Sequence, residues 1–266
     1  MEIEIKDVKY KNIENLNLVF KESEITSIIG ECGSGKTAIL NLIYGLEKKE
    51  NGEIKIGDFY LNSDIKKIEL MNIREYISYL SENYRSELFN INILEDIKYG
   101  LDNFNKEKLN EQLKLFNLNE DILNRSYSEI SNGERKKVLL ISMFLKNSKI
   151  ILLDNPNSGL DRKSIQSLVK LLRKEKRNGK TIILTSHDSN FLLQVSDRVV
   201  VLNNEKVIMD DEKFKVFEKI DLLNKINMEI PKVLDFEIKV KELKNIKLGY
   251  RDNINDLLKD VYRNAK

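Results

Sequence analysis

The chain has 266 residues, of which 41% are hydrophobic and 33% are charged, so it can build one large domain and is too apolar to be disordered throughout. Its 45 basic and 43 acidic residues leave a net charge of +2, which excludes a global field that would point to nucleic acid or to an anionic membrane. The single cysteine, Cys32, excludes an internal disulfide and fits a reducing cytoplasm, and no run approaches the about 18 apolar residues that span a bilayer.

The first thirty residues predict three short strands, because apolar and polar residues alternate along them. The strands are expected at 2–8, 16–20 and 24–29. We expect them to form a half-buried antiparallel sheet packed against the segment that follows. The third strand is expected to be buried.

The next residues fit a phosphate-binding loop. Gly30 to Thr37 read G-E-C-G-S-G-K-T and match the P-loop pattern G-x-x-x-x-G-K-[ST], with a buried strand before it and helical spacing up to about Gly45. Glycines let the backbone turn its N–H groups toward a phosphate, and the helix adds its positive N-terminal end. Lys36 can reach the β- and γ-phosphates, and the Thr37 hydroxyl can ligate Mg²⁺. The residues expected to hold the nucleotide are Gly30, Glu31, Cys32, Gly33, Ser34, Gly35, Lys36 and Thr37.

Strands and helices alternate in the rest of the chain, which favours an α/β fold with a mainly parallel sheet. Asn51–Gly52 predicts a turn. From about residue 211 the chain becomes charged and mainly helical, interrupted by Pro231, and we interpret it as a C-terminal extension. The elements expected between these points are a strand at 53–56, a helix at 65–76, a strand at 77–80, helices within 101–124 and at 134–145, a strand at 149–154, a helix at 161–176, a strand at 181–185 and a hairpin of 199–202 with 206–209.

Four further motifs follow the P-loop in a fixed order. Residues 130–134 read I-S-N-G-E, and 150–154 form an apolar run that ends in Asp154, typical of a Walker B strand whose Asp holds Mg²⁺ through water. Residues 158–161 read S-G-L-D, and 185–188 read T-S-H-D and contain the only histidine, His187. In this order the set resembles the signature, D-loop and H-loop of the ATPase subunit of ABC transporters, over residues 1 to about 210.

Two more stretches resemble one branch of that family, the ATPases of energy-coupling factor importers. Residues 77–89 with 93–100 are similar to its Q-loop region, and 222–233 with 240–243 are similar to its C-terminal domain. The resemblance implies an ATP-binding domain at 1–210 with a P-loop NTPase core, an antiparallel β edge and a helical subdomain at about 83–147. It also implies a small helical extension at 211–266 that contacts a second ATPase subunit.

The resemblance also assigns roles to single residues. Two ATP molecules would lie between two head-to-tail subunits, and Ser131 and Gly133 would face the γ-phosphate of the partner's ATP. Tyr10 is the nearest candidate to stack on adenine. Thr37, Asp154 and Glu82 would hold Mg²⁺, and His187 would be the switch histidine.

The chain departs from the family where hydrolysis is concerned. The family has Glu directly after the Walker B Asp, whereas this chain has Asn155, and a carboxamide cannot accept a proton at neutral pH, although it can orient a water. Removing a general base costs roughly 10²- to 10⁴-fold in rate. Glu82 replaces the Q-loop glutamine, and Asn132 replaces a signature glycine. We therefore expect ATP binding with impaired hydrolysis; the alternative is tolerated drift with activity intact.

These observations predict the ATP-binding motor subunit of an importer for a vitamin or a transition-metal ion, peripheral at the cytoplasmic face of the membrane. Its expected partners are a second ATPase, identical or different, and an integral membrane subunit, with no nucleic acid. The alternatives are a peptide or drug exporter, a soluble ABC ATPase acting on DNA or ribosomes, and a regulatory subunit that does not hydrolyse ATP. The C-terminal stretch discriminates against an exporter, whose extension need not resemble the dimer contact. A soluble ABC ATPase usually carries a coiled-coil insertion or two tandem cassettes, and this sequence shows neither. The regulatory subunit would belong to the same importer assembly.

Overall fold

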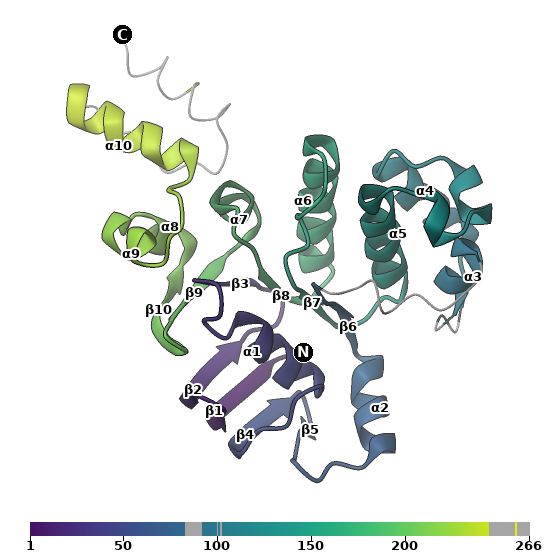
Figure 1. The fold of residues 1–266 in the computed structure, drawn as a ribbon, viewed down its shortest axis with the longest axis horizontal. Helices are drawn as coiled ribbons and strands as arrows, with labels where there is room; N and C mark the ends of the chain where they lie inside the picture. Colours follow the sequence, from purple (N-terminus) through teal and green to yellow (C-terminus); the bar gives the residue numbers. More distant parts are fainter. Residues whose placement is uncertain (83–91, 100, 102, 245–258, 260–266) are drawn as a thin grey trace.

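Two β-sheets form the frame of the molecule (Figure 1). The computed structural model describes residues 1–82, 92–99, 101, 103–244 and 259. The smaller sheet is antiparallel and has the order β2-β1-β4-β5; the larger sheet has the order β10-β9-β3-β8-β7-β6 and is parallel apart from β10 at its edge. The strands are β1 (Ile3–Tyr10), β2 (Ile13–Phe20), β3 (Ile25–Gly30), β4 (Asn51–Ile56), β5 (Phe59–Tyr60), β6 (Ile77–Leu80), β7 (Ile150–Leu153), β8 (Thr181–Thr185), β9 (Arg198–Asn203) and β10 (Lys206–Glu212).

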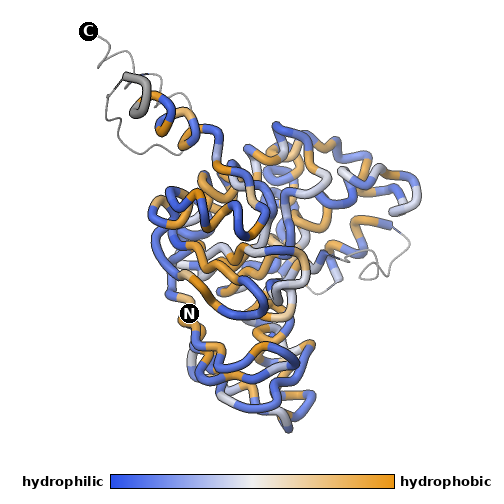
Figure 2. The backbone as a smooth tube through the Cα atoms, turned by 60° about the vertical axis from the view of Figure 1, so that its left-hand side comes forward, coloured by the Kyte–Doolittle hydropathy of each residue, from blue (hydrophilic) through white to orange (hydrophobic). Residues whose placement is uncertain are grey.

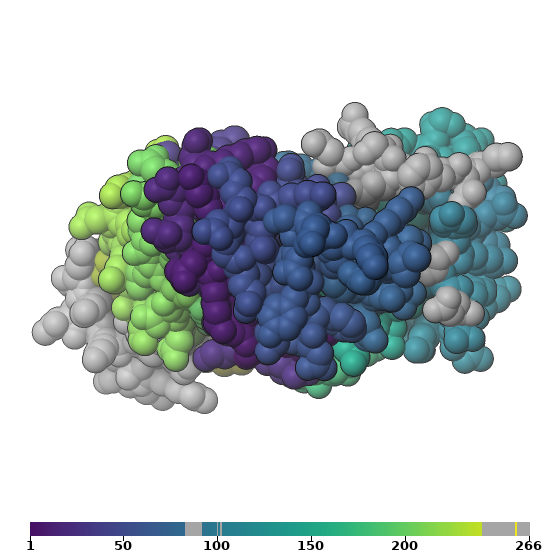
Figure 3. Space-filling model, turned by 90° about the horizontal axis from the view of Figure 1, so that it is seen from below, coloured from purple at the N-terminus to yellow at the C-terminus, as the bar shows by residue number. Residues whose placement is uncertain are grey.

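Helices cover the larger sheet on one face, and α1 with the smaller sheet covers the other (Figure 1). From below, the N-terminal strands and the segment after them occupy the centre of the surface (Figure 3). The described helices are α1 (Lys36–Tyr44), α2 (Lys67–Glu75), α3 (Ile93–Lys98), α4 (Lys106–Leu115), α5 (Asn132–Leu145), α6 (Arg162–Arg177), α7 (Ser189–Val195), α8 (Lys213–Phe217), α9 (Ile220–Lys225) and α10 (Lys232–Lys244), with 3₁₀ turns at Glu120–Asn124 and Tyr127–Glu129. This three-layer α/β arrangement confirms the predicted fold class.

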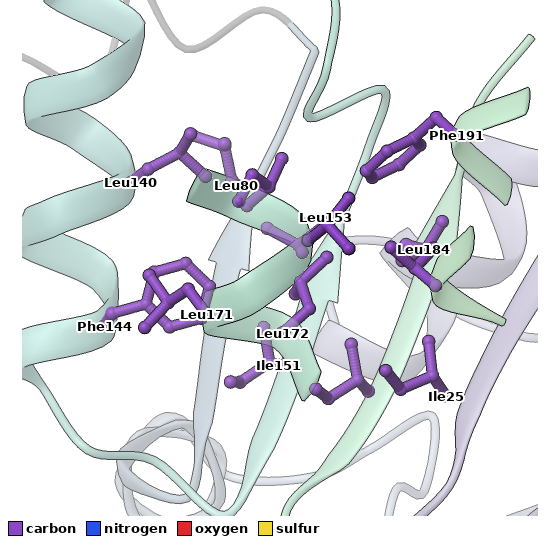
Figure 4. Close-up of a cluster of buried hydrophobic side chains, with 14 of the residues drawn as sticks. Ile25, Leu80, Leu140, Phe144, Ile151, Leu153, Leu171, Leu172, Leu184 and Phe191 are labelled. Atoms are coloured by element: carbon purple, nitrogen blue, oxygen red, sulfur yellow. The ribbon is translucent and has the colours of Figure 1, made fainter. Parts of the chain in front are cut away.

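The central strands are apolar on both faces because each face packs against another layer. Successive side chains of a strand point to opposite sides. In β7, Leu152 belongs to the cluster on the α1 side, and Leu153 belongs to the cluster on the side of α5, α6 and α7. Figure 4 shows Leu153 and Leu184 among side chains of those helices, including Phe191. This double burial fixes the strand ends, from which the site is built.

Two expectations about the N-terminal region were wrong. β3 lies in the parallel sheet between β8 and β9, not in the antiparallel sheet with β1 and β2. Asn51 and Gly52 open strand β4 instead of forming a turn. Gly52 has a φ of 86°, and a Cβ there would lie 2.4 Å from the Asp7 carbonyl oxygen, at a point where the pairing of β1 with β4 shifts register. The glycine is therefore required by a close backbone approach at a bulge.

Two short helices, α3 and α7, were not predicted as separate elements. Each begins at a side-chain cap: Asn92 accepts from the Glu95 N–H at 2.9 Å, and Asp188 accepts from the Asn190 and Phe191 N–H groups at 3.0 and 3.1 Å. Such capping residues were the available sequence signal. Of the expected helical subdomain, residues 83–91, 100 and 102 lie outside the described residues.

The C-terminal extension has the expected order of helix, proline and helix, with Pro231 directly before α10. Leu223, Ile226 and Leu234 join the same hydrophobic cluster as α6 and α7, so this part packs onto the main body. Beyond them α10 projects from the body, with hydrophilic and hydrophobic residues interleaved (Figure 2). Residues 245–258 and 260–266 lie outside the described residues. The domain boundary at 210 and the dimer contact stay predictions.

Replacing Leu172 with Ala tests the core on the helical side. Leu172 lies on α6 and is 0% exposed, so the substitution removes buried methyl groups and leaves a cavity. We expect the free energy of unfolding to fall by about 2–5 kcal/mol in urea denaturation. Leu46→Ala is the control, because Leu46 is 55% exposed and its loss should change stability by no more than about 0.5 kcal/mol. Equal losses for the two variants would contradict this packing.

Candidate nucleotide-binding site

A cavity of about 250 Å³ lies where β3, β7 and β8 end. It brings together two groups of the sequence-predicted residues. From the N-terminal region these are Tyr10, Cys32, Gly33, Gly35, Lys36 and Thr37. From the rest of the chain these are Glu82, Asp154, Asn155 and His187. The carboxyl ends of parallel strands meet at one edge of a sheet, which is where ligands bind in α/β folds.

The P-loop backbone needs glycine at its first and last turns. A Cβ on Gly30, whose φ is 153°, would lie 2.3 Å from the Leu202 carbonyl oxygen in the neighbouring strand β9. Gly35 has a φ of 98° and begins α1 without a side-chain cap, so the first N–H groups of the helix are left for an anion. The loop and helix therefore form a cradle of amides.

Lys36 lies across this loop. Its Nζ donates to the carbonyl oxygens of Gly30 and Glu31 at 2.8 and 2.7 Å, and the residue is buried. Burial lowers the pKa of Lys36, and the nearby Asp154 and Glu82 carboxylates oppose that shift. The ammonium is thus positioned at the cavity wall, and a phosphate oxygen could replace the carbonyls as its acceptor.

The Thr37 hydroxyl and the Asp154 carboxylate, two oxygen groups suited to binding a cation, lie next to each other. Thr37 Oγ1 donates to Asp154 Oδ2 at 2.7 Å, and Thr185 Oγ1 donates to the other oxygen of the same buried carboxylate. Mg²⁺ prefers oxygen ligands and is often held by one or two carboxylates together with phosphates and waters. No cluster of three or more His, Cys, Asp or Glu residues occurs in the described part of the chain. The donor set therefore fits Mg²⁺ bound jointly with a phosphate.

The side chain of Asn155 meets that of Glu82. Asn155 Nδ2 donates to Glu82 Oε1 at 3.3 Å, and the Asn155 N–H donates to the Thr185 hydroxyl at 3.0 Å. Asn155 has a φ of 50°, a conformation that Asn tolerates better than most residues. The cavity thus has a carboxamide after the Walker B Asp and a carboxylate opposite it.

His187 lines the same cavity at the end of β8. Burial, and next the charge of Lys36, lower its pKa below the ordinary value of 6.5, although Glu82 and Asp154 oppose the shift. The imidazole is therefore neutral at pH 7 and can accept or donate one hydrogen bond.

Five predicted nucleotide-binding residues do not line the cavity. A Cβ on Gly30 would lie 2.6 Å from Ser34 Oγ, so these two P-loop residues lie against each other. The Glu31 carboxylate accepts from Asn227 of the C-terminal extension at 2.6 Å. Ser131 caps the N-terminus of α5, and Gly133 lies in its first turn. Their place is consistent with a role toward a second subunit, which stays a prediction.

The signature segment is built around the start of α5. The Ser131 hydroxyl caps the helix, and its hydroxyl and N–H both donate to the Glu134 carboxylate, at 2.8 and 2.9 Å. These bonds lower the pKa of Glu134. A Cβ on Gly133 would lie 3.3 Å from the Gly159 carbonyl oxygen, so a glycine there lets the D-loop approach the helix.

Sequence reasoning missed five residues that line the cavity: Lys11, Ile13, Ala38, Thr185 and Glu205. Thr185 precedes His187 by two residues and could have been found from the T-S-H-D motif. Glu205 comes from the turn between β9 and β10, far along the chain, and no sequence pattern pointed to it. Tyr10 ends β1, and the Lys11 ammonium lies 4.7 Å from the centre of its ring.

Comparisons with known proteins agree with this geometry. Residues 13–158 match the family model described as ABC transporter. The chain is 34% identical over 241 residues to the energy-coupling factor transporter ATP-binding protein EcfA2 of Mycoplasma capricolum subsp. capricolum, covering 88% of this chain and 83% of that protein. It is 30% identical over 260 residues to EcfA3 of Oenococcus oeni, covering 94% of this chain and 88% of that protein.

Solved structures are similar in fold. The dimeric ATP-binding cassette MJ0796, in a post-hydrolysis state with ADP and Pi, matches with a TM-score of 0.70 at 28% identity, over 79% of this chain and 98% of that one. The cbiO1 protein of Clostridium perfringens, part of the transporter complex cbiONQ, matches in fold with a TM-score of 0.71 at 22% identity, over 92% and 98% of the two chains. The chain therefore belongs to the ABC transporter family, as an ATP-binding subunit most like those of energy-coupling factor transporters.

Proposed function

We propose that this chain is the ATP-binding motor subunit of an energy-coupling factor importer for a vitamin or a transition-metal ion. It works at the cytoplasmic face of the membrane with a second ATPase, identical or different, and an integral membrane subunit. No helix in the described ranges is both long and apolar enough to cross a bilayer. The observation that carries the proposal is the meeting of the P-loop cradle, Lys36 and the Thr37–Asp154 pair at one cavity.

The residues divide the work of binding. The amides of the loop and of the start of α1 bind phosphate oxygens, and Lys36 adds a positive charge. Thr37 and Asp154 would hold Mg²⁺, which neutralises phosphate charge when bound. Glu82 is the third candidate ligand. Ser131 and Gly133 serve the ATP of the neighbouring subunit, so that ATP holds the two subunits together.

Hydrolysis in this subunit's own site is impaired. Asn155 has no proton-accepting group at neutral pH, and its amide already donates to Glu82. The subunit binds ATP and hydrolyses it slowly. Its signature segment completes the ATP site of a partner subunit that can hydrolyse ATP.

Lys36→Ala tests nucleotide binding. Loss of the ammonium removes charge-assisted hydrogen bonds to phosphate, and we expect the affinity for MgATP in calorimetry to fall by about 10- to 100-fold. Lys206→Ala, which removes an exposed lysine on β10, is the control and should bind as the wild type does. A folded wild-type protein that gives no binding heat with ATP and magnesium would falsify the proposed function.

A double-mutant cycle at residues 82 and 155 tests the impaired site. Asn155→Glu alone places a second carboxyl next to Glu82, whose Oε1 lies 3.3 Å from the amide nitrogen of Asn155. Two like charges this close favour protonation of one carboxyl, and a protonated carboxyl cannot accept a proton. Combining it with Glu82→Gln removes the repulsion. We expect the double variant, with its partner ATPase present, to hydrolyse ATP at least tenfold faster than wild type, and N155E alone to gain less.

If the isolated wild-type protein hydrolyses ATP briskly and Lys36→Ala abolishes this activity, the proposal of an impaired site is wrong. The proposal that the chain binds ATP would still stand. Additive effects of the two substitutions would contradict the coupling between residues 82 and 155.

The integral subunit has a candidate docking groove. Residues of α1, β6, α3 and α5 line a cavity of about 290 Å³, among them Tyr44, Leu80, Tyr99, Leu139 and Met143. Tyr99 is 77% exposed, as an apolar contact for a partner requires. The groove includes Leu80, two residues before Glu82 in the chain. We expect docking around residues 82–89, of which 83–89 lie outside the described residues.

Tyr99→Asp tests this docking. From solubilised membranes, the tagged wild-type chain should co-purify with a polytopic membrane subunit and a second ATPase. We expect Tyr99→Asp to lose most of the membrane subunit and keep its affinity for ATP. Tyr60→Asp is the control, since Tyr60 is 45% exposed on β5, away from the groove. Co-purification with an exporter's membrane subunit would favour that alternative.

A further inference from the structure

The turn between β9 and β10 contains an unusual residue. Asn203 pairs with Lys206, and the two residues between them, Asn204 and Glu205, have φ values of 46° and 60°. A two-residue hairpin turn with both φ values positive is a type I′ turn, which prefers Asn followed by Gly. Glutamate in the second position is disfavoured because its Cβ crowds the backbone. The local rule is therefore broken at Glu205.

Glu205 is also placed in the nucleotide cavity. It lines that cavity with Lys36 and Thr37 and is half-buried, whereas Asn204 is exposed. A Cβ built on Gly35 would lie 3.9 Å from Glu205 Cγ, so the side chain runs beside the end of the P-loop. In the described part of the chain, the residues with positive φ other than Gly, Asn and Asp are Lys11, Ser23 and Glu205, and two of these three line the cavity.

Contacts that stabilise the fold do not explain why a glutamate stands at this turn position. Among the residues that the structure describes, its carboxylate accepts one hydrogen bond, from Asn12 Nδ2 to Oε1 at 3.3 Å. This bond is exposed and long, and such a bond contributes little to stability. A negative charge close to a phosphate site also opposes phosphate binding. Residues that break a backbone rule at a binding site often serve the ligand. What the carboxylate offers is acceptor oxygens, with Oε1 oriented by Asn12.

The position of Glu205 indicates which group of a bound nucleotide would lie next to its carboxylate. Phosphates would bind at the start of α1, by Lys36 and Thr37, and Tyr10, the candidate to stack on adenine, lines the same cavity from the end of β1. Glu205 touches the end of the P-loop through Gly35 and the end of β1 through Asn12, so it lies between these two points. The group between the phosphates and the base of a nucleotide is the ribose, whose 2′- and 3′-hydroxyls are hydrogen-bond donors.

We propose that Glu205 is the ribose-recognition residue of this site and accepts a hydrogen bond from the 2′- or 3′-hydroxyl of the bound nucleotide. This inference rests on the proposed ATP binding. It makes the subunit selective for ribonucleotides over deoxyribonucleotides, and it accounts for a glutamate at a turn position that favours glycine.

The test compares ATP, 2′-deoxyATP and 3′-deoxyATP, each with magnesium, in calorimetric titrations of the whole chain. We expect the wild type to bind ATP about tenfold more tightly than at least one deoxy analogue, as a hydrogen bond to a charged group allows. Glu205→Gly should bind ATP about tenfold less tightly, bind that analogue unchanged, and lose the selectivity. Its melting temperature without nucleotide should be no lower than that of the wild type, because glycine fits the turn.

Asn204→Gly is the matched control. It changes the other residue of the same turn, which is exposed and does not line the cavity, so its selectivity should equal that of the wild type. Loss of selectivity in this variant too would mean that turn geometry, not the carboxylate, is responsible, and would overturn the inference.

Failure of the inference can be told apart from failure of the proposed function. If the wild type binds ATP and both deoxy analogues equally, ribose recognition is wrong while nucleotide binding stands. If the wild type prefers GTP to ATP and Glu205→Gly removes that preference, the carboxylate accepts from guanine instead, and the inference is again overturned. If no nucleotide binds, the proposed function itself fails.

Discussion

The hydrogen bond between Thr37 and Asp154 joins the two halves of the site. Thr37 begins α1 after β3, and Asp154 follows β7, two strands away in the sheet. The bond can form because parallel strands buried on both faces end at the same edge. Thr185, at the end of the intervening strand β8, donates to the same carboxylate. Three strand ends are thus held by one buried side chain, and the positions of Lys36, Asn155 and His187 depend on it.

A second set of contacts connects this site with the segment expected to meet another subunit. Ser186 Oγ, next to His187, donates to Asn157 Oδ1 at 2.7 Å within the buried interior. Further along the D-loop, Asp161 accepts from Lys137 of α5 at 2.9 Å and caps α6 through Ser164. Those donors lower the pKa of Asp161, so the carboxylate stays charged. These contacts link the end of β8 to the segment after β7, and Asp161 of the D-loop to α5.

The sequence predicted what is local and left out what depends on distant contacts. The P-loop, Asp154 and His187 could be placed because each follows an apolar run that can only be a central strand. β3 was put in the wrong sheet because alternation over six residues does not tell which strands pair with it. Gly52 was taken for a turn because Asn-Gly is a turn signal, whereas its role is a close approach to Asp7. The Asn155–Glu82 pair could not be predicted, since it joins residues 73 positions apart.

The backbone conformations and long-range contacts that escaped prediction share a physical reason. Glu205 and Asn155 occupy backbone conformations that local propensity does not favour for most side chains, and the surrounding strands hold them there. Glu31 is likewise held from a distance: its carboxylate accepts from Asn227, while its carbonyl oxygen accepts from Lys36. Local rules are most reliable where a residue serves the fold alone. Asn155 and Glu205 both line the cavity that we propose binds a nucleotide, and the hydrogen bond from Asn227 to Glu31 ties the C-terminal extension to the P-loop.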